Sequence, residues 1–176
     1  LDRAEVHLDA GNSRLAAKDY NKARDLQGAS LPAVIIRRTL LRSQNDVEKG
    51  ISQLKQFLEL DELSAEMSGR EPDTEYRLQL SATYTERTMP QETIEVLTPM
   101  IELRKDREYS GNTRDRNAMF LALRSRANAF LGLGQHKEAI DDYKKANSVI
   151  PDDPGVLNNL AWVLATSPKD ELREPK

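Results

Sequence analysis

One stretch of the sequence, residues 120–153, constrains the fold more than any other. Apolar side chains recur in its first part every three or four residues, which is the spacing of one face of a helix. Gly132 and Gly134 then interrupt the pattern, and a second apolar stripe of the same spacing follows and ends before Pro151. The two stripes consist of Leu123, Ala127, Phe130 and Leu131, and of Ala139, Ile140, Tyr143 and Ala146. The stretch therefore predicts two helices joined by a short turn.

The small residue that opens the second stripe, Ala139, has counterparts earlier in the chain. Ala16, Gly50 and Thr93 are each followed by apolar residues four and seven positions later, as Ala139 is. These followers are Tyr20 and Ala23, Leu54 and Phe57, and Leu97 and Met100. The intervals between the small residues are 34, 43 and 46 residues, so one helical pair recurs in a consistent phase along the chain.

Residues 120–153 resemble a tetratricopeptide repeat, a helical pair of about 34 residues with preferred residue types at fixed positions. The residues at those positions are Leu123, Arg126, Phe130, Ala139, Tyr143, Ala146 and Pro151, with Ala127 where the pattern prefers glycine. The resemblance implies an all-α fold, a tetratricopeptide-type right-handed α-solenoid of antiparallel helix pairs with about nine helices.

The repeat frame predicts a single domain over residues 1–176. Its units are approximately residues 1–30, 31–64, 74–107 and 120–153, followed by a partial unit at 154–176. The two longer intervals place loop insertions at about residues 65–73 and 108–119, where glycine, proline and asparagine favour turns. Because the chain begins with Leu1 rather than methionine, we expect it to be a fragment of a longer protein.

Local signals predict where individual helices begin. Asp153 followed by Pro154 is typical of a helix N-terminus, and Thr88 with Gln91 has the spacing of a capping box. Pro99 falls inside a predicted helix and should kink it or end its regular bonding. The uncharged helix at residues 154–166 should pack through Leu157, Leu160, Ala161 and Leu164. Its apolar character predicts either a longer array or self-association through this C-terminal end.

Composition excludes several classes of partner and site. A net charge of −3 gives no general attraction to nucleic acid, and no apolar run reaches the roughly 18–20 residues of a membrane span. The chain has no cysteine, so disulfides and thiolate chemistry are excluded, and this absence is compatible with the cytoplasm as well as the periplasm. The two histidines, His7 and His136, are far apart in sequence and are assigned structural roles. We therefore expect no catalytic residue, no metal site and no cofactor.

The resemblance implies that two positions of each first helix line a ligand groove. In the last two repeats these are Arg124 and Asn128, and Asn158 and Trp162, with Asn159 beside them. This set resembles a loose version of the carboxylate clamp by which some tetratricopeptide domains hold a peptide C-terminus. The corresponding residues of the earlier repeats are apolar or small, namely Ile35 and Thr39, and Leu78 and Ala82. The alternative is that Arg124 is a solvated surface residue and that the asparagines cap helices or bond to neighbours. Trp162 would then pack in the core against a further helix that follows residues 154–166 in a regular array.

These observations favour a non-enzymatic scaffold that binds a partner peptide or protein segment in its concave groove. The main alternative is a regulatory or positioning module of a larger enzyme or envelope-associated protein, with the chemistry outside these residues. An enzyme built on the helical array itself is a third class, which would need acidic or histidine side chains converging on the groove.

Overall fold

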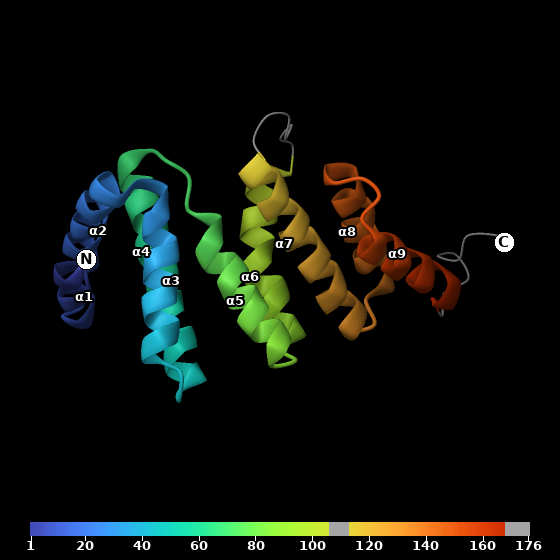
Figure 1. The fold of residues 1–176 in the computed structure, drawn as a ribbon, viewed down its shortest axis with the longest axis horizontal. Coiled ribbons are helices and arrows are strands. Elements are labelled where there is room, and N and C mark those ends of the chain that lie inside the picture. Colours follow the sequence, from blue (N-terminus) through green and yellow to red (C-terminus); the bar gives the residue numbers. More distant parts are fainter. Residues whose placement is uncertain (106–112, 168–176) are drawn as a thin grey trace. The chain divides into compact units, whose positions relative to one another are not determined.

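The computed structural model describes residues 1–105 and 113–167 of the chain. These residues form helices and turns, and no strand occurs among them (Figure 1). The helices are α1 (Asp2–Asp9), α2 (Ser13–Gln27), α3 (Leu31–Arg42), α4 (Val47–Ser68), α5 (Thr74–Glu86), α6 (Pro90–Arg104), α7 (Thr113–Gly132), α8 (His136–Val149) and α9 (Pro154–Thr166), with a 3₁₀ turn, η1 (Gly28–Ser30), before α3. The predicted all-α class of tetratricopeptide-type helix pairs is confirmed.

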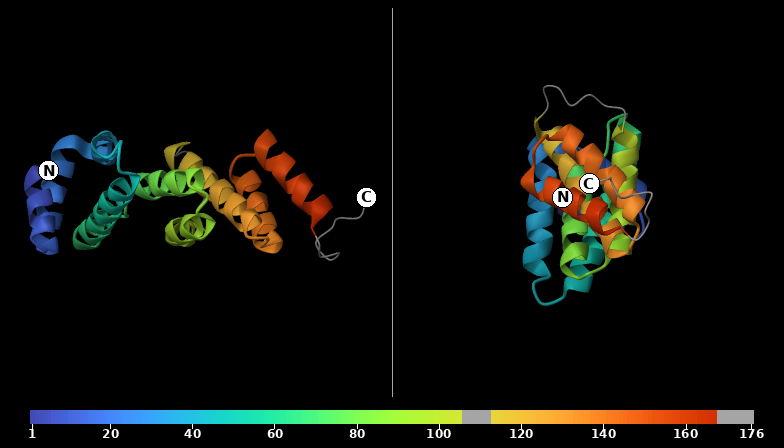
Figure 2. Two further views of the ribbon diagram at one scale, coloured as in Figure 1. Left: turned by 90° about the horizontal axis from the view of Figure 1, so that it is seen from below. Right: turned by 90° about the vertical axis from the view of Figure 1, so that its right-hand side faces the viewer.

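The chain divides into two compact units, with the boundary inside α5. Unit 1 is Leu1–Leu80, in which α2 packs against α1 and α4, and α3 packs against α4. Unit 2 is Ser81–Lys176, in which α7 packs between α6 and α8, and α8 packs against α9 (Figure 2). The assignment of residues 1–176 to a single domain stays a prediction.

The phase of the repeat is confirmed by burial. Ala16, Gly50, Thr93 and Ala139 are all buried, and so are the apolar residues that follow each of them by four and seven positions. A Cβ atom on Gly50 would lie 2.5 Å from the Ser43 hydroxyl oxygen at the end of α3. The small residue thus allows the close approach of two paired helices.

Both predicted insertions are partly helical, so the loop assignments were too long. Helix α4 continues to Ser68, with Ala65 buried, and ends where Gly69 adopts a left-handed conformation with φ 66°. Helix α7 begins at Thr113, so residues 113–119 of the second insertion extend it; residues 106–112 lie outside the described residues. In both places buried apolar side chains prolong the helix face beyond the repeat frame.

One predicted helix cap is wrong and another is confirmed. Thr88 has a left-handed backbone, φ 57°, and the Met89 N–H donates to the Tyr84 carbonyl at 2.9 Å to close α5. Helix α6 then begins at Pro90 without a side-chain cap, which excludes the capping box of Thr88 with Gln91. By contrast, the Asp153 carboxylate accepts from the Val156 N–H at 2.9 Å and caps α9.

The proline inside α6 does not end that helix. Pro99 is exposed, and α6 runs as one helix from Pro90 to Arg104. The carbonyl that Pro99 leaves without its helical N–H donor is that of Glu95, which is an exposed residue of α6. An end of the helix at Pro99 is therefore excluded, and a kink at this residue stays a prediction.

The packing face of α9 also differs from the prediction. Val156 and Val163 are fully buried, whereas Leu157 is 41% exposed. Of the other three residues assigned to packing, Ala161 is exposed, and Leu160 and Leu164 are half-buried. Helix α9 packs against α8, and no described helix of unit 2 covers its other side (Figure 1).

A buried polar cluster around Asp61 joins α2, α4 and the start of α5 in unit 1. Asp61 is fully buried, and one of its carboxylate oxygens accepts from the Tyr20 hydroxyl at 3.1 Å and from Arg70 at 2.6 Å. The other oxygen accepts from the Asp73 N–H at 2.6 Å. The Tyr20 hydroxyl also lies 3.1 Å from that of Tyr76. The cluster fixes the beginning of α5 within unit 1.

In this cluster an arginine lies beside the carboxylates, and the tyrosine hydroxyls are neutral. Arg24 pairs with Asp73 and lies 3.7 Å from Asp61. Burial raises the pKa of both Tyr20 and Tyr76, so their hydroxyls are neutral hydrogen-bond donors near pH 7.

The corresponding interaction in unit 2 is a buried ion pair between α7 and α8. Arg126, 6% exposed, donates to both carboxylate oxygens of Asp142 at 2.6 and 2.9 Å. Its remaining nitrogen donates to the Thr98 hydroxyl of α6 at 3.1 Å, and its guanidinium lies 5.6 Å from the Phe130 ring centroid. One side chain thus links three consecutive helices.

Candidate functional site

A polar cluster at the surface of unit 2 contains three of the residues predicted to line a groove. The Tyr143 hydroxyl donates to the Asn128 side-chain oxygen at 2.5 Å. The Asn159 side-chain N–H group donates to the same oxygen at 3.2 Å and lies 3.3 Å from the Tyr143 hydroxyl oxygen. Arg124 is half-buried, one turn before Asn128, and its guanidinium lies 5.4 Å from the Phe120 ring centroid. We call Arg124, Asn128, Tyr143 and Asn159 the asparagine cluster.

Tyr143 is the member that the sequence did not predict as part of a site. Its ring is fully buried, as its position in the apolar stripe indicates, but its hydroxyl reaches the asparagines. Burial raises the pKa of this hydroxyl, although the Asn159 hydrogen bond and the charge of Arg124 act in the opposite direction. The hydroxyl therefore stays neutral near pH 7 and orients both amides. The signal in the sequence is the tyrosine hydroxyl itself, since Tyr143 is the member of its apolar stripe that carries a polar group.

The two other predicted groove residues lie on α9 outside these hydrogen bonds. Asn158 is exposed, and the Trp162 side chain is 54% exposed. The alternative that Trp162 packs in the core against a further helix stays a prediction. For Asn128 and Asn159 the alternative of neighbour bonds is correct in part, since one polar atom of each is used within the cluster.

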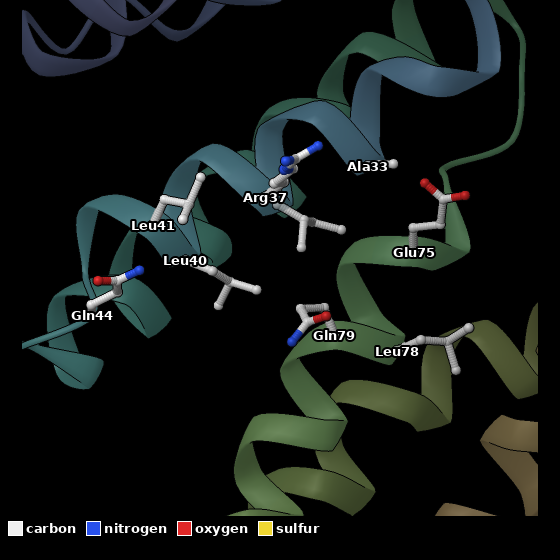
Figure 3. Close-up of a pocket in the computed structure, with 9 residues that line it drawn as sticks. Ala33, Arg37, Leu40, Leu41, Gln44, Glu75, Leu78 and Gln79 are labelled. Atoms are coloured by element: carbon white, nitrogen blue, oxygen red, sulfur yellow. The ribbon is translucent and has the colours of Figure 1, made fainter.

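Unit 1 has an apolar groove between α3 and α5, with a cavity volume of about 670 Å³. Its walls are Ala33, Ile36, Arg37, Leu40, Leu41 and Gln44 of α3, and Glu75, Leu78 and Gln79 of α5. Leu40 and Gln79 point toward each other across it (Figure 3). We call this feature the α3–α5 groove.

The groove corrects the predicted frame of the second repeat. Ile35 is fully buried and Thr39 is 4% exposed, so neither lines a groove as the resemblance implied. The burial of these two residues, four positions apart, places them on the packed face of α3. Arg37 is exposed on the groove, while Arg38 pairs with carboxylates of α1.

Neither histidine belongs to the asparagine cluster or lines the α3–α5 groove. His7 lies 3.7 Å from the Asp19 carboxylate, and His136 is half-buried at the start of α8. Within residues 1–105 and 113–167, no group of histidine, aspartate and glutamate side chains has the arrangement of a metal site. No helix in that part of the chain is long and apolar enough to cross a membrane.

The chain resembles a known protein family over part of its length. A family model described as a tetratricopeptide repeat matches residues 125–153. No match was found among curated proteins. The matched residues contain the end of α7 and all of α8, and therefore the Arg126–Asp142 ion pair together with Asn128 and Tyr143 of the asparagine cluster.

Proposed function

We propose that this chain, a tetratricopeptide repeat protein, is a non-enzymatic scaffold that binds a segment of a partner protein. Tetratricopeptide repeats are typical of protein–protein interaction modules, because their stacked helices present extended surfaces to a ligand. The observation that carries the proposal is the asparagine cluster, in which Asn128 is exposed on the matched repeat and Arg124 and Asn159 are half-buried beside it. The proposal assigns the chain no catalytic step and no cofactor, since repeats of this type act by binding.

The chemistry of the cluster favours a segment that ends in, or contains, a carboxylate. The Arg124 guanidinium can hold a carboxylate through two parallel hydrogen bonds. Asn128 and Asn159 each offer donor and acceptor atoms to the backbone of an extended peptide. Because Tyr143 already orients both amides, less side-chain freedom is lost when a ligand binds.

Residues of α9 extend this surface. Trp162 is 54% exposed, and an exposed tryptophan is a frequent anchor at protein interfaces. Asn158 is exposed on the same helix. We propose that both residues contact the part of the ligand that extends beyond the carboxylate.

The test is binding to an array of synthetic peptides with free or amidated C-termini. For a peptide that binds the wild-type chain, Arg124→Ala and Asn128→Ala should each weaken binding by about 1–3 kcal/mol. Lys144→Ala is the matched control, because Lys144 is an exposed cation on α8. If a confirmed peptide ligand binds all three variants equally well, the asparagine cluster is not the binding site.

The exposed side of α9 supports a further part of the proposal, namely that two copies of the chain associate through it. Leu157 and Trp162 are 41% and 54% exposed, so association would remove apolar surface from water. Light scattering after size-exclusion chromatography should show a mass that rises with concentration, and Trp162→Ser should suppress this rise. A strictly monomeric wild-type chain at high concentration would contradict self-association.

A further inference from the structure

We infer that the α3–α5 groove is a second docking site, for an amphipathic helix that carries a carboxylate beside its apolar face. None of the groove residues lies in the matched repeat or in the asparagine cluster. The inference extends the proposed function to unit 1, and it rests on that function only in taking the ligand to be a segment of a protein.

The first argument is that α3 is apolar on two faces and unit 1 uses only one of them. Leu31 and Ile35 are fully buried on the packed face. On the groove, Leu40 is 40% exposed and Leu41 is 58% exposed, while Ile36 is 9% exposed. An apolar surface that gathers in a groove, rather than being scattered over the molecule, is typical of an interaction site.

The second argument is that the groove walls suit a helix better than an extended peptide. Both walls are helices, whose backbone groups are already hydrogen-bonded within α3 and α5. An extended segment would find only side chains such as Gln44 and Gln79 for its own backbone groups, whereas a helix satisfies these groups internally. Helix α3 has 12 residues, and at about 1.5 Å per residue it can accompany roughly three turns of a partner helix.

The third argument is the charge on the α3 wall. Arg37 is exposed and lies three and four positions before Leu40 and Leu41, so all three share one face of α3. Its neighbour Arg38 pairs with Asp2 and Glu5, but Arg37 forms no ion pair with another residue of the described part of the chain. An acidic side chain next to the apolar face of the ligand would complement Arg37 through a bidentate hydrogen bond.

The experiment uses three fluorescent peptides as probes and measures fluorescence anisotropy with the full chain. The first peptide is an alanine-based helix of about four turns, with leucines along one face and a central glutamate beside them. The second replaces the glutamate with lysine, and the third has the first peptide's composition in scrambled order. The chain variants are Leu40→Asp and Arg37→Glu. Their controls are Leu26→Asp and Arg14→Glu, which change exposed residues of α2 outside the groove.

The wild-type chain should bind the glutamate peptide saturably, about tenfold more tightly than the lysine peptide, and should not bind the scrambled peptide. Leu40→Asp should weaken binding of the glutamate peptide at least about tenfold, because it places a charge in the apolar groove. Arg37→Glu should reverse the preference between the two peptides, and both controls should behave as wild type. Unfolding would weaken binding of both peptides and could not reverse the preference. The reversal therefore distinguishes a changed groove charge from a destabilised variant.

The inference is overturned if the glutamate peptide does not bind up to about 1 mM, or if Leu40→Asp binds it as tightly as Leu26→Asp. An unchanged preference in Arg37→Glu would overturn the assigned role of that residue. Arg124→Ala is measured in the same assay and should leave the helical probe unaffected. If the chain does not bind the helical probe but still binds a peptide from the array, only the docking site in the α3–α5 groove is refuted. If it binds the helical probe but no peptide from the array, only binding at the asparagine cluster is refuted.

Discussion

Replacing Asp61 with asparagine changes one carboxylate oxygen to an amide NH2 group in the buried polar cluster of unit 1. Three donors face this carboxylate, from the Tyr20 hydroxyl, the Arg70 guanidinium and the Asp73 N–H. An asparagine has one acceptor oxygen, so in either orientation its amide N–H group meets at least one of these donors. The variant therefore leaves a buried donor without a partner and removes the charge opposite two arginines.

The expected cost follows from these two effects. A buried donor without a partner costs about 1–3 kcal/mol. The lost charge adds less than a fully buried pair would, because the Arg24 and Arg70 side chains are 21% and 19% exposed. Together they predict that Asp61→Asn lowers the free energy of unfolding by about 2–4 kcal/mol. This corresponds to a decrease on the order of 1–2 M in the urea concentration at the unfolding midpoint.

Urea unfolding followed by circular dichroism measures this change. The matched control is Asp25→Asn, an exposed aspartate of α2, which should alter stability by less than about 0.5 kcal/mol. If Asp61→Asn unfolds at the same urea concentration as Asp25→Asn, the hydrogen bonds around Asp61 do not hold unit 1 together. That result would refute the reasoning from buried donors.

Three further predictions concern single interactions. Arg126→Met should destabilise the chain by about 3–5 kcal/mol in urea unfolding, because it leaves the Asp142 carboxylate buried and unpaired; adding Asp142→Leu should restore most of this loss, and a double variant no better than the single one would contradict it. Burial raises the pKa of Tyr76, so the stability it contributes is present below about pH 10 and is lost as the pH rises through the folded pKa. The urea midpoint of the Tyr76→Phe variant should therefore decrease less between about pH 10 and 11 than that of the wild-type chain. An equal decrease in both proteins argues against a buried Tyr76 phenol. The Arg3 hydrogen bond lowers the pKa of Asp19, so this pair stabilises the folded chain above about pH 4 and less as the pH falls through the folded pKa; in an NMR titration of the carboxylate, Arg3→Ala should raise the pKa of Asp19, and an unchanged value would exclude the pair.

The repeat architecture could be predicted because it depends on local spacing. The distance of four or seven residues from a small residue to its apolar followers determines one helix face, and it placed Ala16, Gly50, Thr93 and Ala139 in the core without knowledge of any tertiary contact. Helix ends were less predictable. Residues after the repeat frame, such as Ala65, still find apolar neighbours, so the helix continues.

The polar clusters show what spacing does not reveal. Tyr20 and Tyr76 are 56 residues apart, and only the folded chain brings their hydroxyls together beside Asp61. For the candidate site, the sequence placed Asn128 and Asn159 correctly but not Tyr143, because a buried tyrosine reads as an apolar residue in the repeat pattern. For the α3–α5 groove, the sequence placed Leu78 of α5 on a groove but missed the α3 wall, because α3 buries Ile35 and presents its other apolar face outward.

The most direct test of partner binding is an NMR titration that follows side-chain amide signals of the ¹⁵N-labelled chain. A peptide selected from the array is added while the resonances of Asn128, Asn159 and the Trp162 indole are observed. These signals should shift together and saturate at one dissociation constant, whereas the amide of Asn45, exposed in unit 1, should not move. Saturable binding that leaves Asn128 and Asn159 unshifted would contradict the assignment of the binding site to the asparagine cluster.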